Sequence, residues 1–482
     1  MMDTHKAAME SEMREMATSG GFVGHQVSLG MVQNPDLHRQ YTMLSTSEVF
    51  AASQASKPLE LRASASRSFG ESSKQRTERQ MLEEMEHLMR SPKADVLTRD
   101  YSESLRASFL HKSLELRQAL YSGTFTPLGS FQSQGWHLPQ LHRNPDAEIT
   151  AIVEPCLAPR STLNPDMKTT EELAKLYGVP VFSSIDDFLA SPAAKVTDGV
   201  IVASNHASHH EIGTKSMQAG LHVLIEKPMS TDPREAHELA CLAAESNKLF
   251  MVNNSANFRE QAKKAHELVR AGELGEIRQV QCYMGSALLW LFDNPENVGW
   301  VKPSGTMQGN GFGWGQLSHS LAWVYMVTGL TPEGLTCHMG YSAVTGADIF
   351  DSAVVRCTNG ATISVQGVAA LPFKSYTEST KQIDNKIFGT EGMLTYSGED
   401  MHPDSGALIL KRHDGKDQRF EGFYFENYSA DGYGPESLKA FIDGCLGKPV
   451  FNGADAIVGL KAVQTIDAMY RSAKSGQPES VV

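Results

Sequence analysis

The sequence predicts an α/β fold in which a parallel-sheet domain is followed by an α/β domain with a large, mostly antiparallel open sheet. Two observations predict it. Residues 199–228 form a strand, helix, strand unit whose strands, 200–203 and 223–225, are continuous apolar runs with β-branched residues, as in sheets buried on both faces. From Ile277 onward, apolar and polar residues alternate over long runs, which is typical of antiparallel strands.

Local signals place the other elements of the first domain. Gly220 ends the central helix, 211–219, because glycine readily adopts the left-handed conformation that follows a helix. Ser184 caps a short helix at 184–189. Further helices are expected at residues 136–143, 169–177 and 232–247, and further strands at 148–153, 179–182 and 249–252.

A helix is expected at 259–271, with Gly272 and Gly275 beyond it, before the long alternating runs of the second domain. Its strands are expected at residues 278–291, 336–342, 352–368, 381–388, 393–396 and 407–412. Two helices, 435–446 and 454–475, close the chain, and the second carries an apolar stripe at helical spacing.

Polar side chains follow the two strands of the central unit. Ligands of parallel sheets bind at the carboxyl ends of the strands, so these side chains are candidates for binding and chemistry. They are Ser204, Asn205, His209, Glu226 and Lys227.

The two parts of this unit, Ala203-Ser-Asn followed by His209-x-Glu and Ala219-Gly-Leu-His-Val-Leu-Ile-Glu-Lys-Pro, resemble the glucose-fructose oxidoreductase / inositol dehydrogenase (Gfo/Idh/MocA) family. The resemblance runs from about Gly135 to the C-terminus. It implies a Rossmann-type NAD-binding domain at 125–252 and a substrate-binding and oligomerisation domain at 253–482. The implied function is hydride transfer between a nicotinamide cofactor and a sugar, cyclitol or related polyol, with Lys227 catalytic and Ser204, Asn205, His209 and Glu226 on the cofactor side.

The phosphate loop departs from the family pattern. A Gly-x-Gly-x-x-Gly loop needs glycines for a tight turn and for close approach to the pyrophosphate. Counting back from Gly135, Ser130 and Gln132 stand at the first two glycine places, and Gly129 is one residue out of register. The loop is therefore remodelled or damaged, and Gly129, Gln134 and Gly135 are its candidate cofactor contacts.

Glu154 follows the expected strand 148–153, about 20 residues past the glycines, where an acidic side chain can bind the adenosine ribose hydroxyls. Because a carboxylate would repel a 2′-phosphate, Glu154 favours NAD over NADP. The alternative is a surface glutamate at a strand end.

A Gly-rich stretch, Gly309-Asn-Gly-Phe-Gly-Trp-Gly, opens a helix that carries His319. The resemblance implies a catalytic His at the fifth position of an Asp-x-x-x-His pattern; His319 matches that His, and Gly315 stands at the Asp position. Lys227 and His319 are thus the candidate proton-transfer groups, and which of them is the base stays open.

Asn310 and Trp314 are candidate substrate contacts, with Trp290 and Trp300 as further stacking surfaces.

Charge, hydropathy and cysteine spacing limit the classes of binding partner, the location and the metals to be expected. A net charge of −13 without a clustered basic face argues against nucleic acid or a membrane surface. No run approaches the roughly 18 apolar residues of a membrane span, and the start lacks the apolar core of a secretory signal, so a cytoplasmic location is expected. The six cysteines lack metal-type spacing, so no metal is expected. The sheet domain is expected to form a homo-oligomer, most simply a dimer.

Residues 1–124 differ in character and are expected to form a poorly ordered extension with possible helices at 77–90 and 101–121. Met81, Met85 and Met89 repeat on the first of these helices and favour a packing face over a cofactor box. Two alternatives remain open. The altered loop suits a non-catalytic sensor or scaffold that keeps the fold, and the abrupt change at Gly135 suits a misassembled gene start.

Overall fold

The computed structural model describes residues 137–159, 167–372, 381–399, 402–423 and 436–482. The chain divides into two units, Met1–Gly123 and Thr124–Val482, and every described residue belongs to the second. The possible helices at 77–90, which carries the methionine repeat, and at 101–121 lie outside the described residues, as do the candidate cofactor residues Gly129, Gln134 and Gly135.

The first domain contains parallel strands in two groups. Strands β3 (Gly199–Val202), β4 (His222–Ile225) and β5 (Phe250–Val252) form one parallel sheet. Strands β1 (Ile152–Val153) and β2 (Val181–Phe182) form a separate parallel pair. Both are shorter than the expected runs. Pro180, which has no N–H to donate, comes directly before β2, and its carbonyl accepts from Ile152 N at 3.0 Å.

The helices of this domain begin at the residues that the local sequence indicates. Thr169 and Glu172 form a reciprocal capping box at the start of α10 (Thr170–Tyr177). Ser184 accepts from Asp187 N at the start of α11 (Ile185–Leu189). The remaining helices are α9 (Leu138–Arg143), α12 (His209–Gln218) and α13 (Pro233–Glu245), the last capped by Asp232.

The second domain contains a nine-stranded sheet in the order β13-β12-β11-β10-β6-β9-β8-β7-β14. All of its strand pairs are antiparallel except β6 with β9. The sheet is therefore mostly antiparallel, as predicted. Its strands are β6 (Ile277–Ser286), β7 (Pro332–Tyr341), β8 (Asp348–Cys357), β9 (Thr362–Val368), β10 (Lys381–Gly389), β11 (Gly392–Glu399), β12 (His402–Arg412), β13 (Gln418–Phe423) and β14 (Glu479–Ser480).

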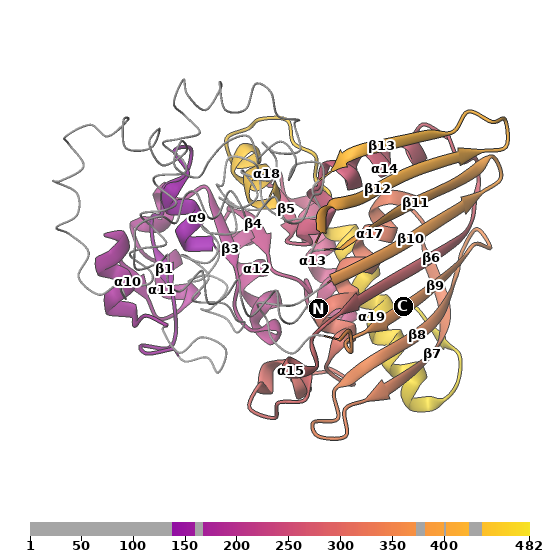
Figure 1. Ribbon diagram of the computed structural model, residues 1–482. Coiled ribbons are helices and arrows are strands. Elements are labelled where there is room, and N and C mark those ends of the chain that lie inside the picture. Colours follow the sequence, from indigo (N-terminus) through magenta and orange to yellow (C-terminus); the bar gives the residue numbers. More distant parts are fainter. Residues whose placement is uncertain (1–136, 160–166, 373–380, 400–401, 424–435) are drawn as a thin grey trace, which may run out of the picture. The chain divides into compact units, whose positions relative to one another are not determined.

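Helices cover one face of this sheet. Helix α17 (Ser318–Thr328) packs on β6, and α19 (Ala456–Ser475) packs on β7, as Figure 1 shows. Helix α14 (Glu260–Arg270) packs on α17, and α18 (Glu436–Cys445) lies against β4. On the other face, every second residue of β8 from Phe350 onward is exposed. This outer face carries no described helix.

Two expected strands are wrong in extent. The run 352–368 is two strands, because a turn with Gly360 at a φ of 83° separates β8 from β9. The end of the run 278–291 turns into the short helix α15 (Leu289–Phe292) instead of continuing β6. Strands β13 and β14 and helix α16 (Val298–Val301) were not expected from the sequence.

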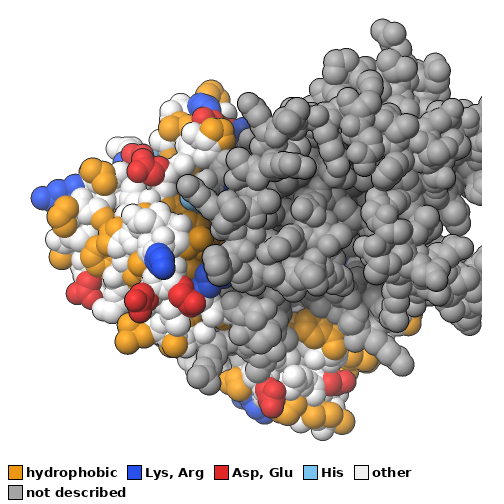
Figure 2. Space-filling model, turned by 60° about the vertical axis from the view of Figure 1, so that its left-hand side comes forward, with side chains coloured by type: hydrophobic (Ala, Val, Ile, Leu, Met, Phe, Trp, Pro, Cys, Tyr) orange, Lys and Arg blue, Asp and Glu red, His pale blue; other side chains and the backbone are white. Residues whose placement is uncertain are grey.

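One hydrophobic core joins the two domains. It runs from Val223 and Ile225 of the parallel sheet, through Phe258, to Leu321 of α17 and Ile466 of α19. Helix α19 contacts both α13 and β7, so it connects the domains through packed apolar side chains. On the surface in view in Figure 2, acidic and basic side chains are interspersed. Within the described ranges, no helix combines the length and the apolar character that crossing a membrane requires.

Candidate active site

Glu226 is held at the carboxyl end of β4 by side chains from two other elements. Its Oε1 accepts from Asn253 Nδ2 at 2.6 Å and lies 2.9 Å from His137 Nε2. Burial acts to raise the pKa of Glu226, but the hydrogen bonds from His137 and Asn253 and the nearby charge of Lys227 outweigh it and lower that pKa. Glu226 is therefore a buried carboxylate.

Lys227 is only 8% exposed, and its ammonium group reaches the second domain. Nζ donates to the carbonyl oxygen of Gly315 at 2.6 Å and lies 5.7 Å from the ring centroid of Trp300. Burial lowers the pKa of Lys227 to about 8, with the charge of Lys381 acting in the same direction and that of Glu226 opposing it. The amine can therefore gain and lose a proton near neutral pH.

His319 is the second residue of α17, directly after the π-helix η6 (Gly313–Leu317). Burial lowers its pKa well below the usual value, and the positive charges of Lys227, Lys381 and Arg259 lower it further. The imidazole is therefore neutral at pH 7. Its Nδ1 is buried and makes no hydrogen bond to any residue that the structure describes.

Lys227 and His319 belong to different domains and lie in one cluster. The Gly315 carbonyl that holds Lys227 Nζ is about one helical turn before His319. Asn254, just after β5, donates from Nδ2 to the carbonyl of Ser318 at 3.2 Å and so ties the parallel sheet to the start of α17. These contacts bring together two residues that are far apart in sequence.

Gly315 supplies a backbone acceptor at the position where the family pattern has an Asp. A Cβ at Gly315 would lie 3.2 Å from the ring of Trp300 and 3.4 Å from that of Phe292, so a larger side chain would require these rings to shift. The glycine at this position therefore leaves room for the rings of Trp300 and Phe292, and its backbone carbonyl accepts the hydrogen bond from Lys227.

The candidate cofactor residues that the structure describes lie at strand ends. Glu154 is buried directly after β1, and its Oε1 accepts from Cys156 N at 2.9 Å. Ser204 and Asn205 follow β3, and Asn205 Oδ1 accepts from Ser208 N at 3.2 Å. The two ring nitrogens of His209 lie 2.9 Å from the Pro228 carbonyl and 3.1 Å from the Ser204 carbonyl, so this buried ring links the ends of β3 and β4.

The candidate substrate residues Asn310 and Trp314 make contacts within their own surroundings. Asn310 Nδ2 donates to the carbonyls of Gly299 and Lys302 at 3.0 and 2.9 Å. Trp314 is 1% exposed and stacks on Tyr470 with ring centroids 5.9 Å apart. These contacts hold the Gly-rich stretch in place.

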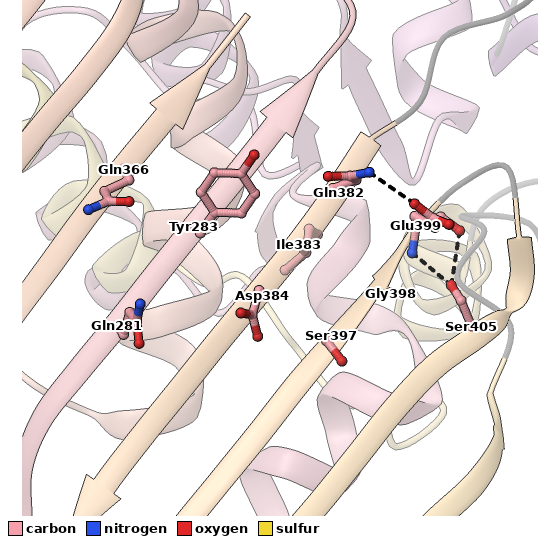
Figure 3. Close-up of a pocket in the computed structure, with 10 residues that line it drawn as sticks. All are labelled: Gln281, Tyr283, Gln366, Gln382, Ile383, Asp384, Ser397, Gly398, Glu399 and Ser405. Carbon is pink, nitrogen blue, oxygen red and sulfur yellow. Dashed lines mark hydrogen bonds between the residues drawn. The ribbon is translucent and has the colours of Figure 1, made fainter. Parts of the chain in front are cut away.

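Two hollows lie away from this cluster, and neither is lined by Lys227 or His319. One, of about 550 Å³, lies on the outer face of the large sheet and is lined mostly by polar side chains of β6 and of β9 to β12. Figure 3 shows these residues. The other, of about 470 Å³, is lined by Gly309, Asn310, Tyr470 and their neighbours.

Sequence reasoning missed several residues of the cluster. Asn253 and Asn254 follow β5 at its carboxyl end, so the rule that pointed to Glu226 and Lys227 could have found them. His137, Arg259 and Lys381 carry no such signal, because tertiary packing alone brings them close.

Comparison with known families agrees with this architecture. Residues 128–254 match the model of the oxidoreductase family with an NAD-binding Rossmann fold, and residues 262–395 match the GFO/IDH/MocA C-terminal domain. The two domains of the fold thus match the two family models in the order in which the chain presents them. The chain belongs to the Gfo/Idh/MocA family.

The similar curated proteins are oxidoreductases and dehydrogenases. An uncharacterised oxidoreductase of Streptococcus pneumoniae is 27% identical over 211 residues, which cover 44% of this chain and 52% of that protein. The trans-1,2-dihydrobenzene-1,2-diol dehydrogenase of Sus scrofa is 25% identical over 233 residues, which cover 47% and 62%. The chain spans about a third to three fifths of the length of the curated relatives it matches.

Solved structures share the fold. An oxidoreductase domain protein from Kribbella flavida has a TM-score of 0.56 and 17% identity, covering 74% of this chain and 100% of that chain. GenD2 from gentamicin A biosynthesis, solved in complex with NAD, has a TM-score of 0.55 and 19% identity, covering 74% and 97%.

Proposed function

We propose that this protein transfers a hydride between NAD and a small polyol, such as a sugar or a cyclitol, with residues 125–252 binding the cofactor and 253–482 the substrate. The observation that carries the proposal is the position of Lys227, whose pKa of about 8 and hydrogen bond to Gly315, just before the His319 helix, suit proton transfer at the edge of an NAD-binding sheet. Two relatives support the substrate class: the porcine diol dehydrogenase and the dTDP-3,4-didehydro-2,6-dideoxy-alpha-D-glucose 3-reductase of Actinomadura kijaniata.

The two proposed catalytic side chains take different roles. Bound NAD would accept the hydride from the carbon that carries the reacting hydroxyl. Lys227 in its neutral form accepts the hydroxyl proton, and in its charged form returns a proton when a carbonyl is reduced. His319 is neutral and has Nδ1 available, so it orients the same hydroxyl by a hydrogen bond.

Glu154 supports NAD as the preferred cofactor. It is buried directly after β1, where a carboxylate can accept from the adenosine ribose hydroxyls and would repel a 2′-phosphate. We expect NAD to bind more tightly than NADP, and Glu154→Ala to reduce the difference. Tighter binding of NADP by the unmodified chain would contradict this assignment.

We also propose that the outer face of the large sheet forms a homo-oligomer, most simply a dimer. Phe350 and Val354 on this face are 47% and 56% exposed, although both are large apolar side chains. The polar hollow of Figure 3 lies on the same face, on strands beside β8, and offers hydrogen-bonding groups to a partner.

Titration of the full chain with NAD and NADH tests the function directly. Binding of either cofactor, followed by a change in NADH absorbance when polyols or their ketones are added, supports the oxidoreductase. If neither cofactor binds, the proposed function is wrong and a non-catalytic sensor or scaffold is the better assignment. The altered loop, with Ser130 and Gln132 at two glycine places, would then fail to bind the cofactor phosphates.

A further inference from the structure

The glycines of the stretch 309–315 are required by close approach to two buried side chains. A Cβ at Gly309 or Gly313 would clash with the ring of Tyr470 on α19. A Cβ at Gly311 would clash with Asp348, and the backbones of these two residues form an isolated parallel bridge. The Gly-rich stretch therefore lies directly on Tyr470 and Asp348.

Asp348 fixes this stretch by two strong hydrogen bonds. Its Oδ2 accepts from the backbone N–H of Gly313 at 2.7 Å, and its Oδ1 accepts from the hydroxyl of Tyr470 at 2.6 Å. Gly313 is the first residue of η6, so a carboxylate satisfies an N–H that a helix start otherwise leaves without a partner. Asp348 is 1% exposed, and the contact is shielded from water.

A β-bulge places a second carboxyl beside Asp348. Tyr341 of β7 pairs with Asp348 and Gly340 pairs with Phe350, so Ile349 is an extra residue in β8. As a result, Asp348 and Asp351 are both buried, although they are three positions apart on a strand. Burial and the Asp348 charge raise the pKa of Asp351 well above its usual value, so Asp351 holds the proton.

Asp348 is then the ionised member of this pair. Burial raises its pKa as well, but the hydrogen bonds from Tyr470 and Gly313 favour its charged form. The other titratable groups that face the pair are Cys337 and Tyr341 of β7. Both are neutral at pH 7, since burial raises pKa values that already lie above 7.

The stretch held by Asp348 leads directly to the proposed catalytic cluster. Gly315 comes two residues after Gly313, and its carbonyl accepts from Lys227 Nζ. His319 follows after a further turn of helix. A displacement of Gly313 therefore moves both the acceptor of Lys227 and the start of the His319 helix.

We propose that Asp348 and Tyr470 are positioning residues, which hold Lys227 and His319 in register through the Gly-rich stretch. This inference rests on the proposed function for its effect on turnover. The hydrogen bonds themselves are independent of it.

The test compares Tyr470→Phe and Asp348→Asn with Tyr325→Phe in the full chain. Tyr325 of α17 is equally buried, and its hydroxyl lies 2.6 Å from Thr465 Oγ1 of α19, so the control loses a similarly buried hydrogen bond that also involves α19. In the two test variants kcat should fall about 10- to 100-fold, with KM for NAD within about twofold, since small displacements of reacting groups slow catalysis strongly. Tyr325→Phe should keep kcat within about twofold.

The pH profile gives a readout that loss of stability does not produce. If the Gly315 carbonyl is displaced, the charged form of Lys227 loses a hydrogen bond and the pKa of Lys227 falls. The change in kcat/KM near pH 8 should therefore move to lower pH in Tyr470→Phe. It should stay in place in Tyr325→Phe.

Amide hydrogen exchange over residues 309–317 separates this inference from the proposed function, because it needs no turnover. Exchange should rise about 10-fold in Tyr470→Phe and Asp348→Asn and stay unchanged in Tyr325→Phe. If the unmodified chain transfers no hydride, the proposed function fails and the exchange result still decides the hydrogen-bonded support. Unchanged exchange and kcat in Tyr470→Phe, or an equal loss of kcat in Tyr325→Phe, overturns the positioning role. Should Asp348→Asn fail to fold, Tyr470→Phe decides alone.

Discussion

At the scale of single residues, burial decides which groups of the cluster can exchange protons. Lys227 has a pKa near 8, whereas Glu226 stays ionised and His319 stays neutral around pH 7. Three side chains at one site are thus held in three different protonation states by burial, hydrogen bonds and neighbouring charge. This difference supports assigning proton transfer to Lys227.

We expect replacement of Lys227 by Met to lower kcat about 10²- to 10⁴-fold, because the proton-transfer group is lost. NAD binding and thermal unfolding should change little. Lys215→Met is a matched control, since Lys215 makes only surface ion pairs with Asp186 and Glu211. Normal turnover in Lys227→Met, measured by NADH absorbance, would remove Lys227 from the mechanism.

The pKa of Lys227 also predicts opposite pH limbs for the two reaction directions. Alcohol oxidation needs the neutral amine, so kcat/KM should rise as pH increases through about 8. Carbonyl reduction needs the ammonium, so kcat/KM should fall over the same range. Profiles measured with NAD and with NADH check this, and limbs of the same sign would contradict the assignment.

At the scale of elements, the bulge in β8 makes the stability of the folded chain depend on pH, because it buries Asp351. The pKa of Asp351 is raised in the folded chain, so its contribution to stability is present below its unfolded pKa and is lost as pH rises through the folded pKa. Asp351→Asn stays neutral at every pH and keeps a similar shape. We therefore expect this variant to have a Tm a few degrees higher, with a larger gain at pH 8 than at pH 5.

Thermal unfolding at the two pH values checks the expectation for Asp351. Asp384→Asn on the outer face of β10 is the control, because Asp384 makes a partly exposed ion pair with Lys386 and should give a small change. A loss of stability in Asp351→Asn at pH 8 would show that Asp351 carries a needed negative charge.

At the scale of the whole molecule, the outer sheet face predicts self-association. The unmodified chain should be a dimer by light scattering at micromolar concentration, and Val354→Lys should shift it toward the monomer because a charge would be buried in the interface. Val196→Lys is a matched control, since Val196 is 71% exposed and lies in the first domain. A monomer in the unmodified chain would count against the interface.

The sequence by itself determined the two-domain class, most helices and the strand ends that carry Glu226 and Lys227. These features depend on residues close together in the chain: the capping box of Thr169 and Glu172 lies within one turn, and an apolar run followed by polar residues marks the end of a buried strand. His319 and Lys227 were both identified as candidates, because each lies in a short sequence motif of the family that can be read without knowing the fold.

Only the tertiary structure decided how these helices and strands pack against one another. The bulge at Ile349 depends on which strand pairs with which, and the apolar alternation of the chain does not contain that information. The bulge brings Asp348 and Asp351 together, and the packing of α19 places Tyr470 beneath the Gly-rich stretch. The carbonyl of Gly315 became the partner of Lys227 for the same reason: backbone acceptors carry no sequence signal, and only the fold places one beside an amine.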